Sequence, residues 1–249
     1  MLKVKNSVRI PLKDFVGKGS YQERIEYAKN LNNQLYQALQ AKRFEGVLSV
    51  DEYKNTLKKV LPENIKFNFK TYVKKFLGHD DAYVSMIINN YDEAEKFEIQ
   101  IPSRKNVSGE RIIDKRDDKL SMHETFHLFF EMANPKHIVR CDFNDTEYKF
   151  YQNWIYNRDY SKFNLKKKIE WKRGLNEFLA NKKKEKQIDF LQNSRYRLIE
   201  EKLAYKEGEK YGKDNCMSEA FHFDEKIKII EKMLYKTIKK ARKENKINR

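Results

Sequence analysis

The chain has 249 residues, of which 39% are hydrophobic and 13% aromatic, with only 8 Gly and 4 Pro. This composition excludes a disordered chain, allows a sizeable core, and favours helices and short loops over a turn-rich β-sandwich. The formal net charge of +16 would suit a polyanionic partner. Lysines spread over a solvated surface are the simpler explanation, because charge alone informs on solubility and partners rather than on fold.

The number of cysteines and the hydropathy of the chain indicate the cellular compartment to expect. Two cysteines, Cys141 and Cys216, are too few for a disulfide framework and suit a reducing environment. Residues 1–15 contain no apolar run typical of a signal peptide, and no stretch approaches the roughly 18 apolar residues of a membrane span. We therefore expect a cytoplasmic chain without a membrane span, and signal-less secretion into another cell stays open.

The first third of the chain shows helical patterns. Two capping boxes, Ser20–Glu23 and Ser49–Glu52, mark helix starts, and Pro62 requires the second helix to stop before it. Apolar residues at helical spacing predict three helices, at about 21–44, 50–61 and 69–78. We therefore expect a helical N-terminal region over 1–78, packed on a domain over 79–249.

Two strands are predicted next, at 82–88 and 96–102, with a hairpin connection at 89–95. The second strand alternates, so that one face carries apolar residues and the other polar ones. Its residues on the two faces are Phe97, Ile99 and Ile101, against Glu98 and Gln100. Residues 103–118 look like a polar loop.

A helix that is apolar on nearly every side follows at 119–133, a pattern typical of a buried central helix. Residues 137–169 are aromatic and irregular. Three more helices are predicted at about 170–185, 188–210 and 223–242. The basic run 236–249 is expected to be a frayed tail, the alternative being a contact to nucleic acid or to an acidic partner.

The central helix carries the motif His-Glu-x-x-His at His123, Glu124 and His127. Residues four apart lie on one face of a helix, so both imidazoles can bind one Zn²⁺ at about 2.0–2.1 Å. Glu124, rotated by about 100°, can reach a water at the metal and act as general base. Two imidazoles without partners would be costly to bury on such a helix, which favours a metal site.

A catalytic zinc needs a third protein ligand and an open fourth position. The metzincin continuation is excluded, because Phe130 and Ala133 stand where that pattern needs Gly and His. Five downstream residues are candidates for the third ligand: Glu177, Glu200, Glu201, His137 and His222.

The zinc motif followed by Asn176-Glu177-Phe-Leu-Ala180 resembles the gluzincin pattern and is similar to that of anthrax lethal factor-like and ImmA/IrrE-like metallopeptidases. The resemblance implies an α+β, zincin-like domain, mostly helical overall, with a small antiparallel sheet and a central zinc-binding helix. It also implies Glu177 as third ligand, although Glu201 stands in the same Glu-x-x-Ala pattern. In this clan an edge strand binds extended substrate, a role that falls on Phe97, Glu98, Ile99, Gln100 and Ile101.

The function implied is that of a zinc-dependent endopeptidase, either a regulatory protease or a bacterial effector. Its substrate would be a protein or peptide, acidic if the positive charge of the chain attracts it. The alternative is a basic nucleic-acid- or partner-binding protein whose zinc site is structural or non-catalytic. Nucleic acid is the less favoured partner, since Lys dominates over Arg.

Overall fold

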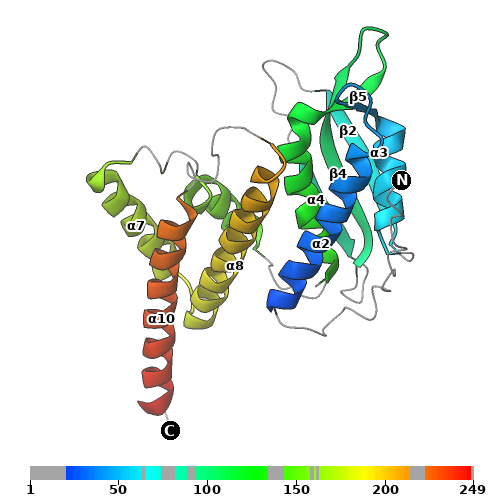
Figure 1. The fold of residues 1–249 in the computed structure, drawn as a ribbon. Coiled ribbons are helices and arrows are strands. Elements are labelled where there is room, and N and C mark those ends of the chain that lie inside the picture. The colour runs from blue at the N-terminus through cyan, green and yellow to red at the C-terminus, as the bar shows by residue number, and fades with distance from the viewer. Residues whose placement is uncertain are drawn as a thin grey trace. The chain divides into compact units, whose positions relative to one another are not determined.

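The computed structural model describes residues 21–62, 65–73, 82–88, 94–133, 143–157, 160, 163–212 and 222–247. These residues are mostly helical and include a small mixed sheet, which agrees with the expected α+β class (Figure 1). The chain forms two compact units. The first consists of Met1–Arg140 with Lys206–Asp214, and the second of Cys141–Tyr205 with Asn215–Arg249.

The first unit contains the sheet and the histidine helix. Its elements are α2 (Tyr21–Gln40), β1 (Val47–Ser49), α3 (Val50–Val60), β2 (Phe67–Val73), β3 (Tyr83–Ile88), β4 (Ala94–Lys105), β5 (Arg111–Asp114), a 3-10 turn (Lys115–Asp117) and α4 (Asp118–Ala133). The capping box at Ser49 is present, because Glu52 N–H donates to the Ser49 hydroxyl and the Ser49 N–H donates to the Glu52 carboxylate. Ser20, of the first predicted box, lies outside the described residues.

Strand β4 is the centre of the sheet. It pairs in parallel with β2 and antiparallel with β3, so the sheet is mixed rather than antiparallel as expected. The predicted helix at 69–78 is wrong over residues 69–73, which belong to β2, and residues 74–78 lie outside the described residues. Apolar residues four apart also share one face of a strand, and Phe69 and Val73 lie opposite Ile99 and Ser103 in the register.

The prediction of a polar loop over 103–118 is also wrong. β4 continues to Lys105 and turns back into β5, with Arg104 opposite Ile112. At the tip, the Asn106 side chain accepts hydrogen bonds from the amides of Ser108 and Glu110. The tip of this hairpin is exposed and therefore polar. Its polar sequence led to the prediction of a loop where the strands continue on both sides of the tip.

The predicted domain boundary at residue 78 does not coincide with the division into units. β2 lies before that boundary and β4 after it, yet the two strands pair over seven registered positions, from Phe67↔Phe97 to Val73↔Ser103. Residues on both sides of 78 therefore belong to one sheet and one compact unit.

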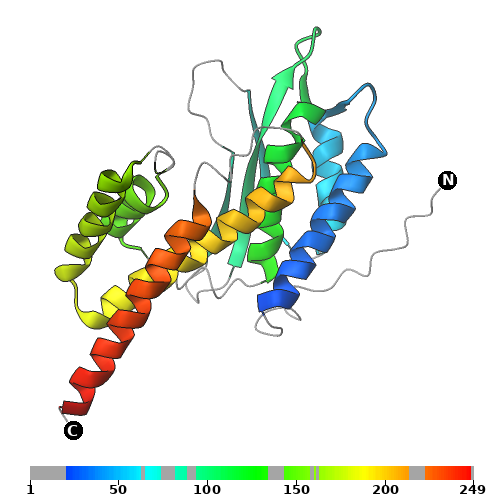
Figure 2. The ribbon, with the colours of Figure 1, turned by 60° about the vertical axis from the view of Figure 1, so that its left-hand side comes forward.

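Helix α4 packs against β3, β4 and α2, all within the first unit (Figures 1 and 2). Asn32 of α2 donates to the main-chain oxygen of Met122 at 3.0 Å and accepts from the Thr125 hydroxyl at 2.6 Å. Of the 16 residues of α4, 14 are buried. The prediction of a central helix that is buried on nearly every side is confirmed.

The second unit is helical with an aromatic core. It contains α6 (Asp145–Phe150), a π-helical turn (Tyr151–Ile155), α7 (Leu165–Ala180), most of α8 (Lys184–Glu209) and α10 (Phe223–Ile247). Two tryptophans of this core form a reciprocal pair of hydrogen bonds. The Trp154 indole N–H donates to the Trp171 main-chain oxygen at 2.9 Å, and the Trp171 indole N–H donates to the Trp154 main-chain oxygen at 2.7 Å. Within the described ranges, no helix has the length and apolarity needed to cross a bilayer.

Candidate metal centre

The two motif histidines lie with their outer ring nitrogens together. His123 Nε2 and His127 Nε2 are 3.2 Å apart, and the two residues are only 6% and 8% exposed. Two nitrogens bound to one tetrahedral ion at 2.0–2.1 Å would be about 3.3–3.4 Å apart. The pair predicted from the four-residue spacing is therefore at the separation that a single metal ion requires.

Glu124 lies beside this pair and is also buried, at 6% exposure. Its Oε1 is 3.9 Å from His123 Nε2, too far for a hydrogen bond but close to the space in front of the ring nitrogens. The carboxylate can therefore act on a small molecule held at the imidazoles without being a metal ligand itself.

A carboxylate completes the group of potential ligands. One ligand atom from each of His123, His127 and Glu201 lies within 4.8 Å of the other two. Glu201 is on α8, a single continuous helix whose last turn, Lys206–Glu209, belongs to the same unit as the histidines. The described residues therefore contain a His-His-Glu group close enough to bind a metal ion.

The end of α8 packs closely against α4 at Gly208. A Cβ at this position would lie 2.6 Å from the Lys119 main-chain oxygen and 3.3 Å from His123 Cβ. Only glycine allows this approach without a shift of one helix. Because Glu201 stands two turns earlier on the same helix, this contact fixes the end of the element that carries it.

Tyrosines surround Glu201 within the second unit. The Tyr156 hydroxyl donates to Glu201 Oε2 at 3.2 Å. The Tyr151 hydroxyl is buried and has no hydrogen-bond partner among the residues that the structure describes. Burial first, and the charge of Glu201 second, raise the pKa of both tyrosines well above the ordinary value. Both hydroxyls thus stay protonated at neutral pH, one holding the carboxylate and the other available to a further polar group.

The other predicted ligands lie elsewhere. Glu177 is on α7 with its side chain 70% exposed and 3.7 Å from the Arg173 guanidinium, and it is not part of the group. The potential metal group among the described residues thus contains Glu201, the alternative, and not Glu177, the residue that the resemblance favoured. Glu200 is buried but also outside the group, His222 lies 3.6 Å from Glu225, and His137 falls outside the described residues.

The predicted substrate strand also needs correction. Residues 96–102 do not form an edge, because β4 is paired with β2 on one side and with β3 on the other. Phe97, Ile99 and Ile101 are buried in the core. On the opposite face Glu98 accepts hydrogen bonds from Asn68, Lys70 and Tyr83, of which the Lys70 bond contributes most to lowering its pKa to about 2. The main-chain groups of β4 are therefore not available to an extended peptide.

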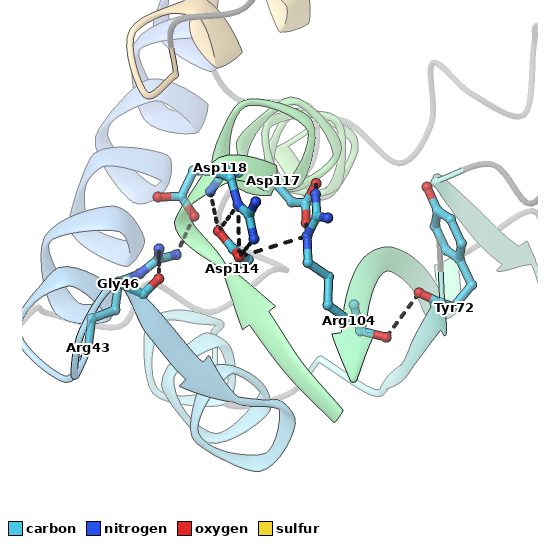
Figure 3. A network of polar contacts seen from close by, with 9 residues as sticks. Arg43, Gly46, Tyr72, Arg104, Asp114, Asp117 and Asp118 are labelled. Carbon is cyan, nitrogen blue, oxygen red and sulfur yellow. Dashed lines mark hydrogen bonds and ion pairs between the residues drawn. The ribbon is translucent and has the colours of Figure 1, made fainter. Parts of the chain in front are cut away.

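Ion pairs hold the start of α4, and sequence reasoning missed them. Asp118 pairs with Arg43, and Asp117 accepts two hydrogen bonds from Arg104, at 2.8 and 3.0 Å (Figure 3). Asp114 caps the preceding turn and pairs with Arg116, whose hydrogen bonds lower the Asp114 pKa. Burial raises the pKa of Asp118 to about 6 despite the attraction of Arg43. The N-terminus of the histidine helix is thus fixed little more than one turn before His123.

Comparison of the chain with protein-family models, with curated proteins and with solved structures gave no match. The interpretation of the site therefore depends on its own chemistry. Two imidazole nitrogens and one carboxylate oxygen are donors that suit zinc and other first-row divalent metals. Catalytic zinc sites have three protein ligands, and three is the number of potential ligands in this group among the described residues.

Proposed function

We propose that the chain is a zinc-dependent endopeptidase. The observation that supports this most is the close group of His123, His127 and Glu201 as potential ligands, with the buried Glu124 beside the first histidine. A zincin-like fold is part of the proposal, supported by a small sheet whose last strand leads into the buried histidine helix. Two imidazoles and one carboxylate are available as metal ligands, and a second carboxylate is available as general base. Metal-assisted peptide hydrolysis needs both roles.

In this proposal Glu124 carries the proton. Zinc bound at the site would polarise the scissile carbonyl and acidify a water molecule. The Glu124 carboxylate accepts one proton from that water while the water oxygen attacks the carbonyl carbon. Glu124 then gives the proton to the nitrogen of the leaving amine as the C–N bond breaks. The products are a carboxylic acid and an amine, and Glu124 returns to its starting form.

The strand that would receive the substrate is β3 rather than β4. Within the described ranges, β3 pairs along one side only, with β4. It also contacts α4, the helix that carries the two histidines and Glu124. An extended peptide can add to such an edge by main-chain hydrogen bonds, with little demand on its sequence.

The test compares Glu124→Gln with the wild-type chain in zinc content and in cleavage of a pooled library of quenched fluorogenic peptides. We expect about one zinc per chain in both proteins, and a fall in cleavage of roughly 10²–10⁴-fold in the variant, because only the general base is lost. Glu170→Gln, an exposed glutamate on α7, is the matched control and should cleave like the wild type.

Two results would contradict the proposal. One is a wild-type chain that folds without metal and cleaves no member of the library. The other is a Glu124→Gln variant that cleaves at the wild-type rate. A chain that holds zinc but cleaves nothing, with or without Glu124, would instead support a binding protein with a non-catalytic metal site.

A further inference from the structure

Helix α10 has two different halves. Its first half packs into the second unit through Phe223, Ile227, Ile230 and Met233, all buried. From Leu234 to Glu244 no residue is buried. In both views the last turns of α10, coloured red, extend past the other helices of their unit (Figures 1 and 2). The basic C-terminal run, expected to be a frayed tail, is helical as far as Ile247.

Lysines form one straight row along this helix. The row is defined by five exposed residues: Lys228, Lys232, Lys236, Lys239 and Lys243. At 100° per residue they fall within an arc of about 80°, and at 1.5 Å per residue they cover about 22 Å of helix. Successive lysines are three or four residues apart, so the row presents one positive charge at every turn, or about every 4.5–6 Å. We call this set the lysine row.

Nearby acidic groups do not neutralise the lysine row. Among the described residues, no hydrogen bond or ion pair involves any of its five ammonium groups. The acidic residues in the first half of the same helix are engaged elsewhere, since Asp224 pairs with Lys202, Glu225 with Lys168 and Glu231 with Arg195. Glu244 is rotated by about 100° from Lys243. Five like charges thus face solvent together, an arrangement that costs repulsion unless an anionic ligand binds there.

We propose that the lysine row binds the phosphate backbone of nucleic acid, without preference for sequence. An extended row of point charges, one per helical turn, matches a linear polyanion better than a compact anion. Lysine supplies charge without the bidentate geometry by which arginine recognises base edges, so discrimination between sequences is not expected. Tyr235, with 68% of its surface exposed, borders the row and offers a ring on which an unpaired base can stack.

An anionic membrane suits the projecting segment less well. Helices that lie in a membrane surface bury a broad face of large apolar residues. On the side of this segment away from the lysine row, the apolar residues are Leu234, Ile238 and the small Ala241, and Leu234 already packs against the core of the unit. The proposal concerns a helix of the second unit and does not rest on the proposed peptidase activity.

The test measures binding of a fluorescent 20-base-pair DNA duplex and of the corresponding single strand by anisotropy, with the full-length chain and several salt concentrations. The variant combines Lys232→Gln, Lys236→Gln, Lys239→Gln and Lys243→Gln. Losing four phosphate contacts should weaken binding roughly 100-fold or more near 0.1 M salt and reduce the slope of log K against log salt by about 3–4.

The control removes the same charge from the same unit at scattered exposed positions: Lys149→Gln, Lys172→Gln, Lys183→Gln and Lys186→Gln. It should bind within about threefold of the wild type, and circular dichroism should show equal helix content in all three proteins. An equal loss of affinity in the control would overturn the proposal, because net charge alone would then explain binding. So would a wild-type chain that binds neither DNA form at low salt, or one that binds only phosphatidylserine vesicles.

Discussion

Glu177 on α7 and Glu201 on α8 stand in the same four-residue pattern, Glu-x-x-Ala, and yet their surroundings are opposite. On α7 the pattern faces solvent, with the Glu177 side chain 70% exposed and Ala180 exposed one turn later. On α8 the alanine, Ala204, is completely buried, and Glu201 belongs to the potential metal group. The motif is the same, and the helix face that carries it decides its role.

The difference follows from how each helix buries its apolar residues. α7 uses Trp171, Leu175 and Leu179, four residues apart on one face, which leaves Glu177 on the opposite side. α8 has no such single stripe, since it is shared between two units and buries residues in different directions along its length. A helix buried on several sides can present a carboxylate to the interior, whereas a one-sided surface helix cannot.

The largest effect that separates the two glutamates should come from Glu201→Gln. Removing the carboxylate leaves two imidazoles, and we expect zinc affinity to fall more than 100-fold, beyond the 10–100-fold typical of outer-shell changes. Glu177→Gln is the matched control and should stay within twofold of the wild type. Competition with a chromophoric chelator measures both affinities. Equal losses of zinc affinity in the two variants would contradict the distinction between Glu201 as a ligand and Glu177 as a surface residue.

A smaller effect should follow from Gly208→Ala, which alters the contact between α8 and α4. The added methyl group would lie 2.6 Å from the Lys119 main-chain oxygen, so one helix must shift. We expect a loss of about 1–3 kcal/mol in the free energy of unfolding, as for other overpacked sites, measured by urea denaturation. Lys206→Ala, at an exposed position two residues earlier, should be nearly neutral. A Gly208→Ala protein as stable as the wild type would mean that this contact does not hold α8.

The smallest effect is expected for Tyr156→Phe, which removes the hydroxyl that donates to Glu201 and leaves the ring in place. Zinc affinity should fall about tenfold, because outer-shell hydrogen bonds orient ligands. Tyr235→Phe, an exposed position on α10, is the control and should change nothing. If both variants bind zinc equally well, Tyr156 does not position the carboxylate.

The elements that the sequence predicted best are those with strong local signals. The buried helix over 119–133, the strands that became β3 and β4, and the capping box at Ser49 all follow from period, alternation or short-range hydrogen bonds. β2 was mistaken for a helix because residues four apart share a face in both structures. β5 was missed because it is only four residues long and directly follows an exposed polar turn, so it shows no clear alternation.

The site shows the same division between local and distant information. The spacing of His123 and His127 fixes their common face, and this much needs no tertiary structure. Which glutamate joins them depends on helix packing, and Glu201 and Glu177 have the same local pattern. The ion pairs of Arg43 with Asp118 and of Arg104 with Asp117 join residues 75 and 13 positions apart, so no short pattern marks them.

The assignment of Glu201 as third ligand is tested most directly by counting imidazoles with X-ray absorption at the zinc edge, in Glu201→His and Glu177→His chains loaded with one equivalent of zinc. The wild type should show two imidazoles and oxygen donors. Glu201→His should show three imidazoles and Glu177→His should still show two. A third imidazole in the Glu177→His chain, or none added in the Glu201→His chain, would contradict the assignment of the metal site.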